Sequence, residues 1–247
     1  MYFYDSNQST MCRLSVNINK IALIRNSRGA NLPDLCQVAK DCEEFGAQGI
    51  TVHPRPDERH IRFSDLSELK EVISTEFNIE GYPSDYFIKK VLEIKPHQVT
   101  LVPDPPDALT STNGWDTILQ QELLKKVVGT FKDKGIRVSL FLNPNLTLIE
   151  SAQRTGTDRI ELYTGGYSQF YGIDKTTAVL PHIQTAKVAT DANLGINAGH
   201  DLNLNNLQWY YRHIPNLQEV SIGHSIICDA LYFGLQNTIA MYLRSLQ

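Results

Sequence analysis

Histidine and glutamate side chains follow several short apolar runs of this sequence. His53 and Glu80 each end such a run, and His200 follows another. Imidazole titrates near neutral pH, and partial burial raises the pKa of a carboxyl group toward the same range. Two bases and an acid facing one cavity would suit a condensation in which several protons move and water leaves. The alternative for Glu80 is a purely structural ion pair.

Two glycines near the end of the chain predict a phosphate site. Gly199 and Gly223 would let backbone N–H groups approach an oxyanion with no side chain in the way. His224 would either donate to the same phosphate or cap the final helix.

Basic residues predict a second pocket that binds an anion, built from Arg28, Arg55 and His60. Guanidinium groups match phosphate oxygens in pairs. The alternative for each arginine is a surface ion pair.

Eight short β-branched or apolar runs position these residues and alternate with segments of helical spacing. The runs cover residues 14–18, 49–53, 78–80, 98–102, 137–142, 159–163, 195–198 and 219–223. This alternation predicts parallel strands with right-handed crossovers, and eight strands in 247 residues predict a single (βα)8 TIM barrel. The working site of such a barrel lies at the carboxyl ends of its strands. A doubly wound open sheet is the alternative, but none of the 15 glycines forms the G-x-G-x-x-G turn typical of that fold.

Helices are predicted between the strands, and one long connection predicts a lid. Helices are expected over Pro33–Gly46, Ser84–Pro96, Asp116–Gly135 and Ile226–Leu246. The connection Val102–Gly114 is stiff with prolines in its first half and small and polar in its second, which is typical of a lid that excludes water. A surface loop without function is the alternative. Among the other histidines, His97, His182 and His213 are expected at the surface.

Composition and charge argue against several classes of protein, namely nucleic-acid binders, membrane-spanning proteins and secreted proteins. A net charge of −4 and a pI near 6.0 argue against a general nucleic-acid binder. No apolar run approaches the length that spans a membrane, and the first residues lack the features of a secretory signal. Cys12, Cys36, Cys42 and Cys228 form no C-x-x-C pair, which favours free thiols in the cytoplasm.

Seven segments of the chain resemble, in order, the motifs of the pyridoxine 5′-phosphate synthase family, the PdxJ family. They are Val16–Gly29, Gly49–Ile61, Leu101–Pro103, Val138–Phe141, Ile160–Gly165, Ile196–His200 and Ile222–His224. The resemblance covers nearly the whole chain and implies a barrel domain over 14–247, preceded by an N-terminal extension over 1–13.

The resemblance implies a cofactor-free, metal-free enzyme assembled as a homo-octamer. Its two phosphorylated substrates would be 3-amino-2-oxopropyl phosphate and 1-deoxy-D-xylulose 5-phosphate, and its products pyridoxine 5′-phosphate, inorganic phosphate and water. By motif position, His53 and Glu80 would accept protons and His200 would donate one. No nucleic acid or membrane partner is implied.

The resemblance also assigns substrate contacts. The aminoketone phosphate would be held by Asn17, Arg28, Asp201, Gly223 and His224, and the pentulose phosphate by Asn19, Lys20, Arg55, His60 and Thr110. Three of these positions depart from the family pattern, in which Asp, His and Gly stand at the positions of Asn19, Lys20 and Asp201. Asp201 adds a negative charge near a phosphate, which is unfavourable unless its side chain turns away; its backbone N–H still serves.

Three other functions fit parts of the pattern. A Schiff-base aldolase on the same barrel would use Lys20 as its nucleophile. A metal-dependent sugar-phosphate enzyme would hold zinc with His53, Glu80 and His200, although no H-x-H or H-E-x-x-H element is present. A non-catalytic binder of phosphate ligands would bind both substrates without turnover.

Overall fold

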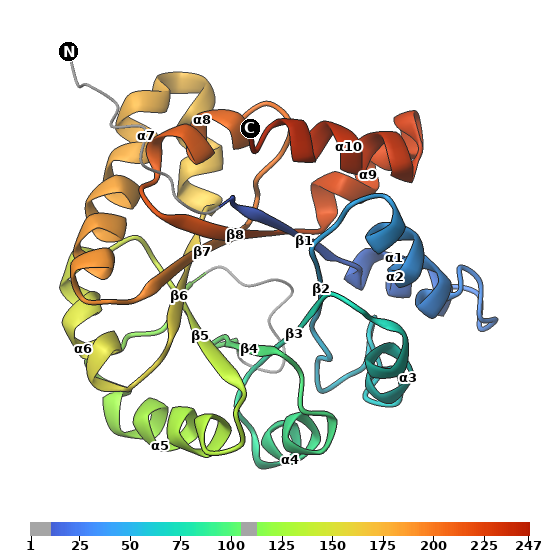
Figure 1. Ribbon diagram of the computed structural model, residues 1–247, viewed down its shortest axis with the longest axis horizontal. Coiled ribbons are helices and arrows are strands. Elements are labelled where there is room, and N and C mark those ends of the chain that lie inside the picture. Colours follow the sequence, from blue (N-terminus) through green and yellow to red (C-terminus); the bar gives the residue numbers. More distant parts are fainter. Residues whose placement is uncertain (1–10, 105–112) are drawn as a thin grey trace.

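Eight parallel strands pair in chain order, and β8 pairs with β1, so that the sheet closes into a barrel (Figure 1). The computed structural model describes residues 11–104 and 113–247. The strands are β1 (Arg13–Asn17), β2 (Gly49–Val52), β3 (Glu76–Gly81), β4 (Gln98–Leu101), β5 (Arg137–Leu142), β6 (Arg159–Tyr163), β7 (Gly195–His200) and β8 (Leu217–Ile222). The predicted (βα)8 barrel is confirmed.

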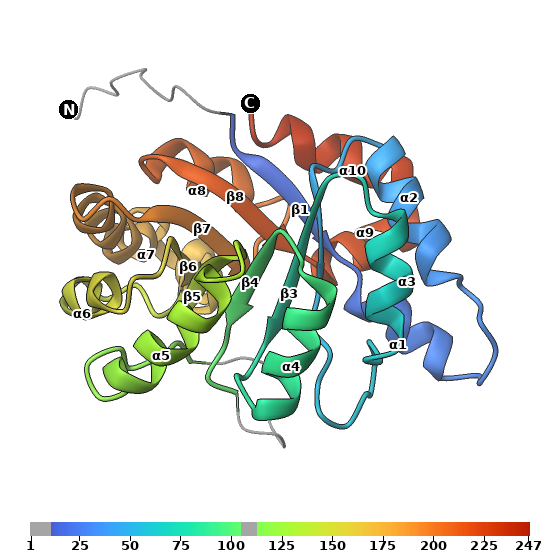
Figure 2. The ribbon, with the colours of Figure 1, turned by 60° about the horizontal axis from the view of Figure 1, so that its bottom comes forward.

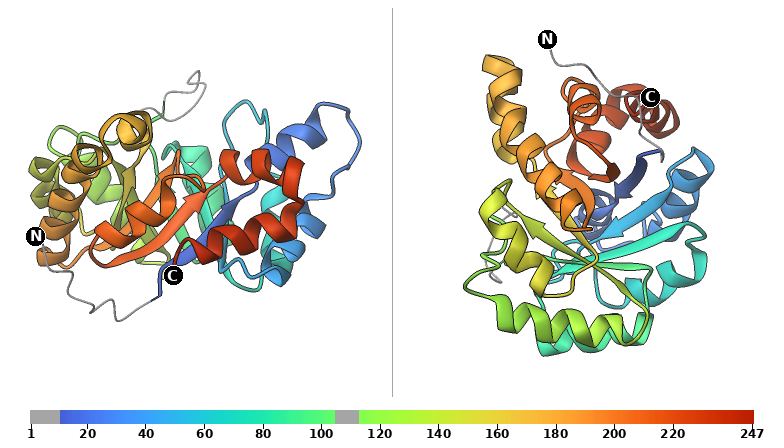
Figure 3. Two further views of the ribbon diagram at one scale, coloured as in Figure 1. Left: turned by 90° about the horizontal axis from the view of Figure 1, so that it is seen from above. Right: turned by 60° about the vertical axis from the view of Figure 1, so that its left-hand side comes forward.

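The helices form an outer ring around the strands (Figures 1 and 2). They are α1 (Asn19–Asn26), α2 (Leu35–Glu44), α3 (Asp65–Val72), α4 (Asp85–Ile94), α5 (Gln121–Lys132), α6 (Ile149–Arg154), α7 (Gly165–Asp191), α8 (Leu207–His213), α9 (His224–Phe233) and α10 (Leu235–Arg244), with a 3-10 turn, η1 (Leu146–Leu148), before α6. Helices α9 and α10 lie beside α1 and α2 (Figure 3). None of the helices in the described ranges is long and apolar enough to cross a membrane.

Burial on both faces explains the continuous apolar character of the strands. All residues of β2 and β4 are buried, as expected for a parallel sheet covered by helices. The barrel interior is partly polar, however. Ser15 and Thr51 share a hydrogen bond of 2.7 Å, Asn78 donates to Thr51, and Thr100 donates to Asn78. These bonds link β1 to β4 below the carboxyl ends of the strands.

Paired charges occupy the amino-terminal end of the barrel. Glu76 forms ion pairs with Arg13, at 2.8 Å, and with Arg137. Glu219 lies 3.6 Å from Arg159 and is buried. Because buried charges are tolerated when they are paired, Arg13 and Arg137 stabilise the ionised form of Glu76, whereas burial raises the pKa of Glu219 to about 8. This cluster lies at the end of the barrel opposite the predicted site.

Three local predictions need correction. The helix expected from Asp116 begins at Gln121, because the Asp116 carboxylate caps a separate turn over 117–120, where it accepts from the N–H groups at 118 and 119. The helix expected over 226–246 is broken at Gly234, whose φ of +75° lies in the left-handed region. His182 is buried, not exposed, and its Nδ1 lies 2.9 Å from the hydroxyl of Tyr210.

Candidate active site

His53 and Glu80, from neighbouring strands, meet at the carboxyl end of the barrel. His53 follows β2 and Glu80 is the penultimate residue of β3, which places His53 Nδ1 4.0 Å from Glu80 Oε2. Asn17, at the end of β1, donates to the same carboxylate oxygen at 3.4 Å. Parallel strands in register place these three side chains together although they are far apart in the sequence.

The environment favours the uncharged forms of both groups. Burial lowers the pKa of His53 well below its ordinary value, and the nearby Arg55 charge lowers it further. Burial raises the pKa of Glu80 to about 8, with a contribution from the Asp104 carboxylate. At neutral pH, a neutral imidazole therefore lies beside a carboxyl group that gains and loses its proton close to that pH.

Arg55 forms a buried ion pair with Asp104, with 2.7 Å between Arg55 Nη2 and Asp104 Oδ2. The arginine side chain is only 5% exposed, so the alternative of a surface ion pair is wrong. A guanidinium group has five N–H donors, and pairing with one carboxylate is compatible with a phosphate contact. Asp104 was missed by the sequence analysis, although a carboxylate three residues after the end of β4 is a usable signal.

His60 lies near the same group, with its ring centroid 6.3 Å from that of His53. Its Nδ1 accepts from the N–H of Ile61 at 2.9 Å, which leaves the ring proton on Nε2 in the neutral form. Burial lowers the pKa of His60 to about 4, and the charges of Arg55 and Lys20 contribute. His60 is therefore a neutral donor in the physiological range.

Asn19 fixes the backbone at His53. Its Oδ1 accepts from the N–H of His53 at 2.9 Å, and its own N–H donates to Asn17 Oδ1 at 3.0 Å. An aspartate carboxylate could accept the same bond, so the departure from the family pattern at Asn19 preserves this contact while removing a charge.

The other side of the site is built from the ends of β7 and β8. His200 Nδ1 lies 2.9 Å from Asp201 Oδ2, so the Asp201 side chain turns toward the histidine. A Cβ at Gly223 would lie 2.9 Å from the carbonyl oxygen of Asn17, which explains the need for glycine there. Gly223 is the N-cap of α9, and the ring of His224, the first residue of that helix, lies 3.6 Å from Cys228 Sγ one turn further along. The His224 ring makes no hydrogen bond to a backbone N–H group of the described residues, so it does not cap the helix.

Glu161, inside the barrel on β6, is a candidate that the sequence analysis did not select. It is buried, and its Oε2 makes no hydrogen bond with any described residue. Burial raises its pKa well above the ordinary value, and the nearby Glu80 raises it further. A Cβ at Gly199 would lie only 2.2 Å from Glu161 Oε1, so the glycine makes room for this carboxyl group. Glu161 could have been found from the sequence, because it is a charged residue between the apolar residues Ile160 and Leu162 of a predicted strand.

A family model described as "Pyridoxal phosphate biosynthesis protein PdxJ" matches residues 14–247. The chain belongs to this family. Proteins named "Pyridoxine 5'-phosphate synthase" are 60% identical over 232 residues in Parabacteroides distasonis and 57% identical over 237 residues in Cytophaga hutchinsonii. These matches cover 94% and 96% of this chain and 98% and 100% of the relatives. They confirm the resemblance to the PdxJ family.

Solved structures of other enzymes share the fold alone. A phosphoribosyl anthranilate isomerase in complex with a reduced ribulose phosphate derivative matches with a TM-score of 0.60 at 13% identity, over 96% of this chain and 98% of that one. A 4-hydroxy-2-oxoglutarate aldolase matches with a TM-score of 0.63 at 13% identity, over 95% and 94%.

Of the residues that the PdxJ resemblance assigns to the site, Arg28 is not joined to it, and Thr110 is not among the described residues. Arg28 is exposed in the segment between α1 and α2, and no contact within the described ranges links its side chain to the other candidates. Thr110 and most of the predicted lid fall within 105–112 and lie outside the described residues.

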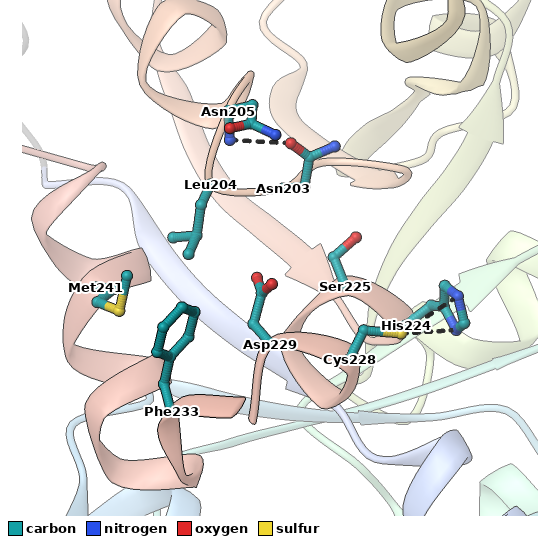
Figure 4. A pocket seen from close by; sticks show the side chains of 9 residues that line it. All are labelled: Asn203, Leu204, Asn205, His224, Ser225, Cys228, Asp229, Phe233 and Met241. Carbon is teal, nitrogen blue, oxygen red and sulfur yellow. Dashed lines mark hydrogen bonds between the residues drawn. The ribbon is translucent and has the colours of Figure 1, made fainter. Parts of the chain in front are cut away.

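A cavity of about 500 Å³ lies beside this PdxJ site, between the β7–α8 connection and helices α9 and α10 (Figure 4). Its lining residues are Asn203, Leu204, Asn205, His224, Ser225, Cys228, Asp229, Phe233 and Met241. The cavity shares His224 with the candidate site, but its lining does not include the catalytic candidates.

Proposed function

We propose that this chain is a pyridoxine 5′-phosphate synthase that works in vitamin B6 biosynthesis. It would condense 3-amino-2-oxopropyl phosphate with 1-deoxy-D-xylulose 5-phosphate into pyridoxine 5′-phosphate, phosphate and water. The observation that carries the proposal is the contact of His53 with Glu80, two proton-transfer groups in uncharged forms, in a chain that matches the PdxJ family over 14–247.

The three catalytic candidates have complementary roles in this proposal. Neutral His53 accepts a proton from a substrate carbon or nitrogen. Glu80, with a pKa of about 8, takes up and returns a proton near neutral pH. His200, on the opposite side of the site, donates a proton to a leaving oxygen. Burial keeps water away from these transfers.

Two anion sites flank these groups in the proposal. By motif position, the aminoketone phosphate is held by Asn17, Arg28, Gly223 and His224 and by the turn at Asp201, whose backbone N–H donates to Thr164 Oγ1 at 3.3 Å. The pentulose phosphate is held by Asn19, Lys20, Arg55, His60 and Thr110. The buried guanidinium of Arg55 supports the second site, because a fixed arginine fork suits phosphate oxygens.

Assembly as a homo-octamer and a cytoplasmic location are part of the same proposal. Leu231 and Tyr232, at the end of α9, are 76% and 86% exposed, and such apolar side chains gain from burial against another subunit. Light scattering of the purified protein tests the assembly: a mass eight times that of the chain supports it, and a monomer contradicts it.

The direct test of activity mixes purified, chelator-treated protein with both phosphates and detects pyridoxine 5′-phosphate by absorbance and mass. Product formation supports the proposal. Borohydride trapping of a substrate on Lys20 would favour the aldolase, and activity that disappears with the chelator would favour the metal-dependent enzyme. Binding of both phosphates without product would favour the non-catalytic binder.

A further inference from the structure

Asp201 differs from the other residues assigned to a phosphate site because its carboxylate pairs with a catalytic candidate, His200. Its Oδ2 lies 2.9 Å from His200 Nδ1, and the two residues are adjacent at the end of β7. The hydrogen bond and charge of His200 hold the pKa of Asp201 below its ordinary value, and the charge of His224 lowers it further. The Asp201 carboxylate is therefore ionised throughout the neutral range.

The backbone of Asp201 is anchored on both sides. Its N–H donates to Thr164 Oγ1 at 3.3 Å, and its carbonyl oxygen accepts from the side-chain amides of Asn203 and Asn206 at 3.4 and 3.3 Å. Asn206 is buried, and Thr164 also donates to the carbonyl oxygen of Gly199 at 2.7 Å. These bonds fix the backbone from which the 42% exposed carboxylate reaches His200.

His200 itself has a backbone conformation that needs support. Its φ of +97° lies in the left-handed region, which a residue with a side chain seldom adopts. The ring of Tyr163 meets the imidazole edge to face at 5.3 Å. The imidazole thus packs against Tyr163 on one side and pairs with Asp201 at Nδ1.

Other titratable groups border this pair. Tyr163 and Glu161 come from β6, and His224 comes from the start of α9. Glu161 lies against Gly199, and burial favours its neutral form. Burial raises the pKa of Tyr163, with a contribution from Asp201, so the phenol is neutral as well. Among the groups that border His200 in the described ranges, Asp201 supplies the negative charge at neutral pH.

We propose that Asp201 is a positioning residue for His200. Its carboxylate engages the Nδ1–H group, which directs Nε2 toward the substrate and stabilises the imidazolium that donates the proton. This inference rests on the proposed function, in which His200 is the proton donor. The carboxylate acts through His200 and does not itself contact the phosphate, which also explains how a negative charge is tolerated beside an anion site.

Asp201→Asn tests the proposal, because asparagine keeps the shape and removes the charge. Two readouts are measured between pH 5.5 and 9. The first is carbethoxylation of His200 by diethyl pyrocarbonate, followed by peptide mass spectrometry, which reports the pKa of the imidazole without requiring activity. The second is the pH profile of product formation.

Loss of the carboxylate removes the negative partner of the charged imidazole, so the carbethoxylation midpoint of His200 moves to lower pH. Because the donor must be protonated, the loss of rate is concentrated on the alkaline side, about five- to tenfold at pH 8.5 and less than about threefold at pH 6. The KM values of both substrates change by less than about twofold. Asp201→Glu restores part of the alkaline rate.

Asp191→Asn is the matched control, because it removes the same charge from the exposed end of α7, near the opposite end of the barrel. Modification of His97, an exposed histidine, serves as the internal reference in each sample. An unchanged carbethoxylation midpoint at His200 in Asp201→Asn overturns the proposal. A shifted midpoint with an unchanged pH profile overturns the role of the pair in the reaction. Failure of the wild-type protein to form product refutes the proposed function instead.

Discussion

Replacing Glu80 with glutamine is expected to change how the stability of the protein depends on pH. The carboxyl pKa rises from an ordinary 4.5 to about 8 in the folded state. The folded chain therefore keeps a proton that the unfolded chain releases, and the free energy of unfolding declines as pH rises through this window. The slope for one group is at most about 1.4 kcal/mol per pH unit, which gives at most about 5 kcal/mol over the whole window.

Glutamine removes this titration while keeping an acceptor for Asn17. Between pH 5.5 and 8.5 the free energy of unfolding of Glu80→Gln, relative to wild type, should rise by about 3 kcal/mol. Glu161 and Glu219 also have raised pKa values and give both proteins a slope of the same sign. Because Glu80 contributes to the raised pKa of Glu161, the difference between the proteins reports Glu80 together with its effect on Glu161.

The measurement is urea unfolding of both proteins at several pH values, with Glu71→Gln, an exposed glutamate, as the control. The control should stay parallel to wild type across the range. If Glu80→Gln is also parallel to wild type, Glu80 is not a proton-holding buried acid, and the reasoning about its environment is wrong.

Other substitutions test the remaining parts of the site. Arg55→Ala should weaken binding of the pentulose phosphate in calorimetry and destabilise the fold by about 3–5 kcal/mol, because it leaves Asp104 buried without its partner; unchanged affinity would remove Arg55 from the second anion site. Gly199→Ala should lower the free energy of unfolding by about 1–3 kcal/mol, since the new Cβ meets Glu161 at 2.2 Å; a melting temperature equal to that of wild type would refute this. His60 stays neutral in the fold, so its stabilising contribution is complete above pH 6.5 and is lost as pH falls toward about 4. His60→Asn should therefore lose less stability than wild type over that interval, and an equal loss would contradict the assignment.

The strands were predictable because a parallel sheet buries both faces. Their apolar runs are short, continuous and separated by helical spacing, and eight of them close a barrel in this length of chain. Helix ends were less predictable. Asp116 looks like a cap, but the turn that it caps does not continue, and Gly234 divides two helices within a segment whose composition favours helix.

The positions of the site residues followed from the strand ends, but their partners did not. The pairing of Arg55 with Asp104 and the approach of Glu161 to Gly199 depend on which strands become neighbours. The burial of His182 against Tyr210 likewise requires the packing of α7 on α8. The backbone of Asp201, from which its carboxylate reaches His200, is held in part by Thr164, which is 37 residues away in the sequence.

One assay decides whether His53, Glu80 and His200 carry out the proton transfers. It measures the rate of pyridoxine 5′-phosphate formation by His53→Ala, Glu80→Gln and His200→Ala beside wild type. Each variant should retain its fold and lose at least about a hundredfold in rate, because positioned proton-transfer groups contribute on that scale. A wild-type rate in all three variants would contradict the assignment of the chemistry to this end of the barrel.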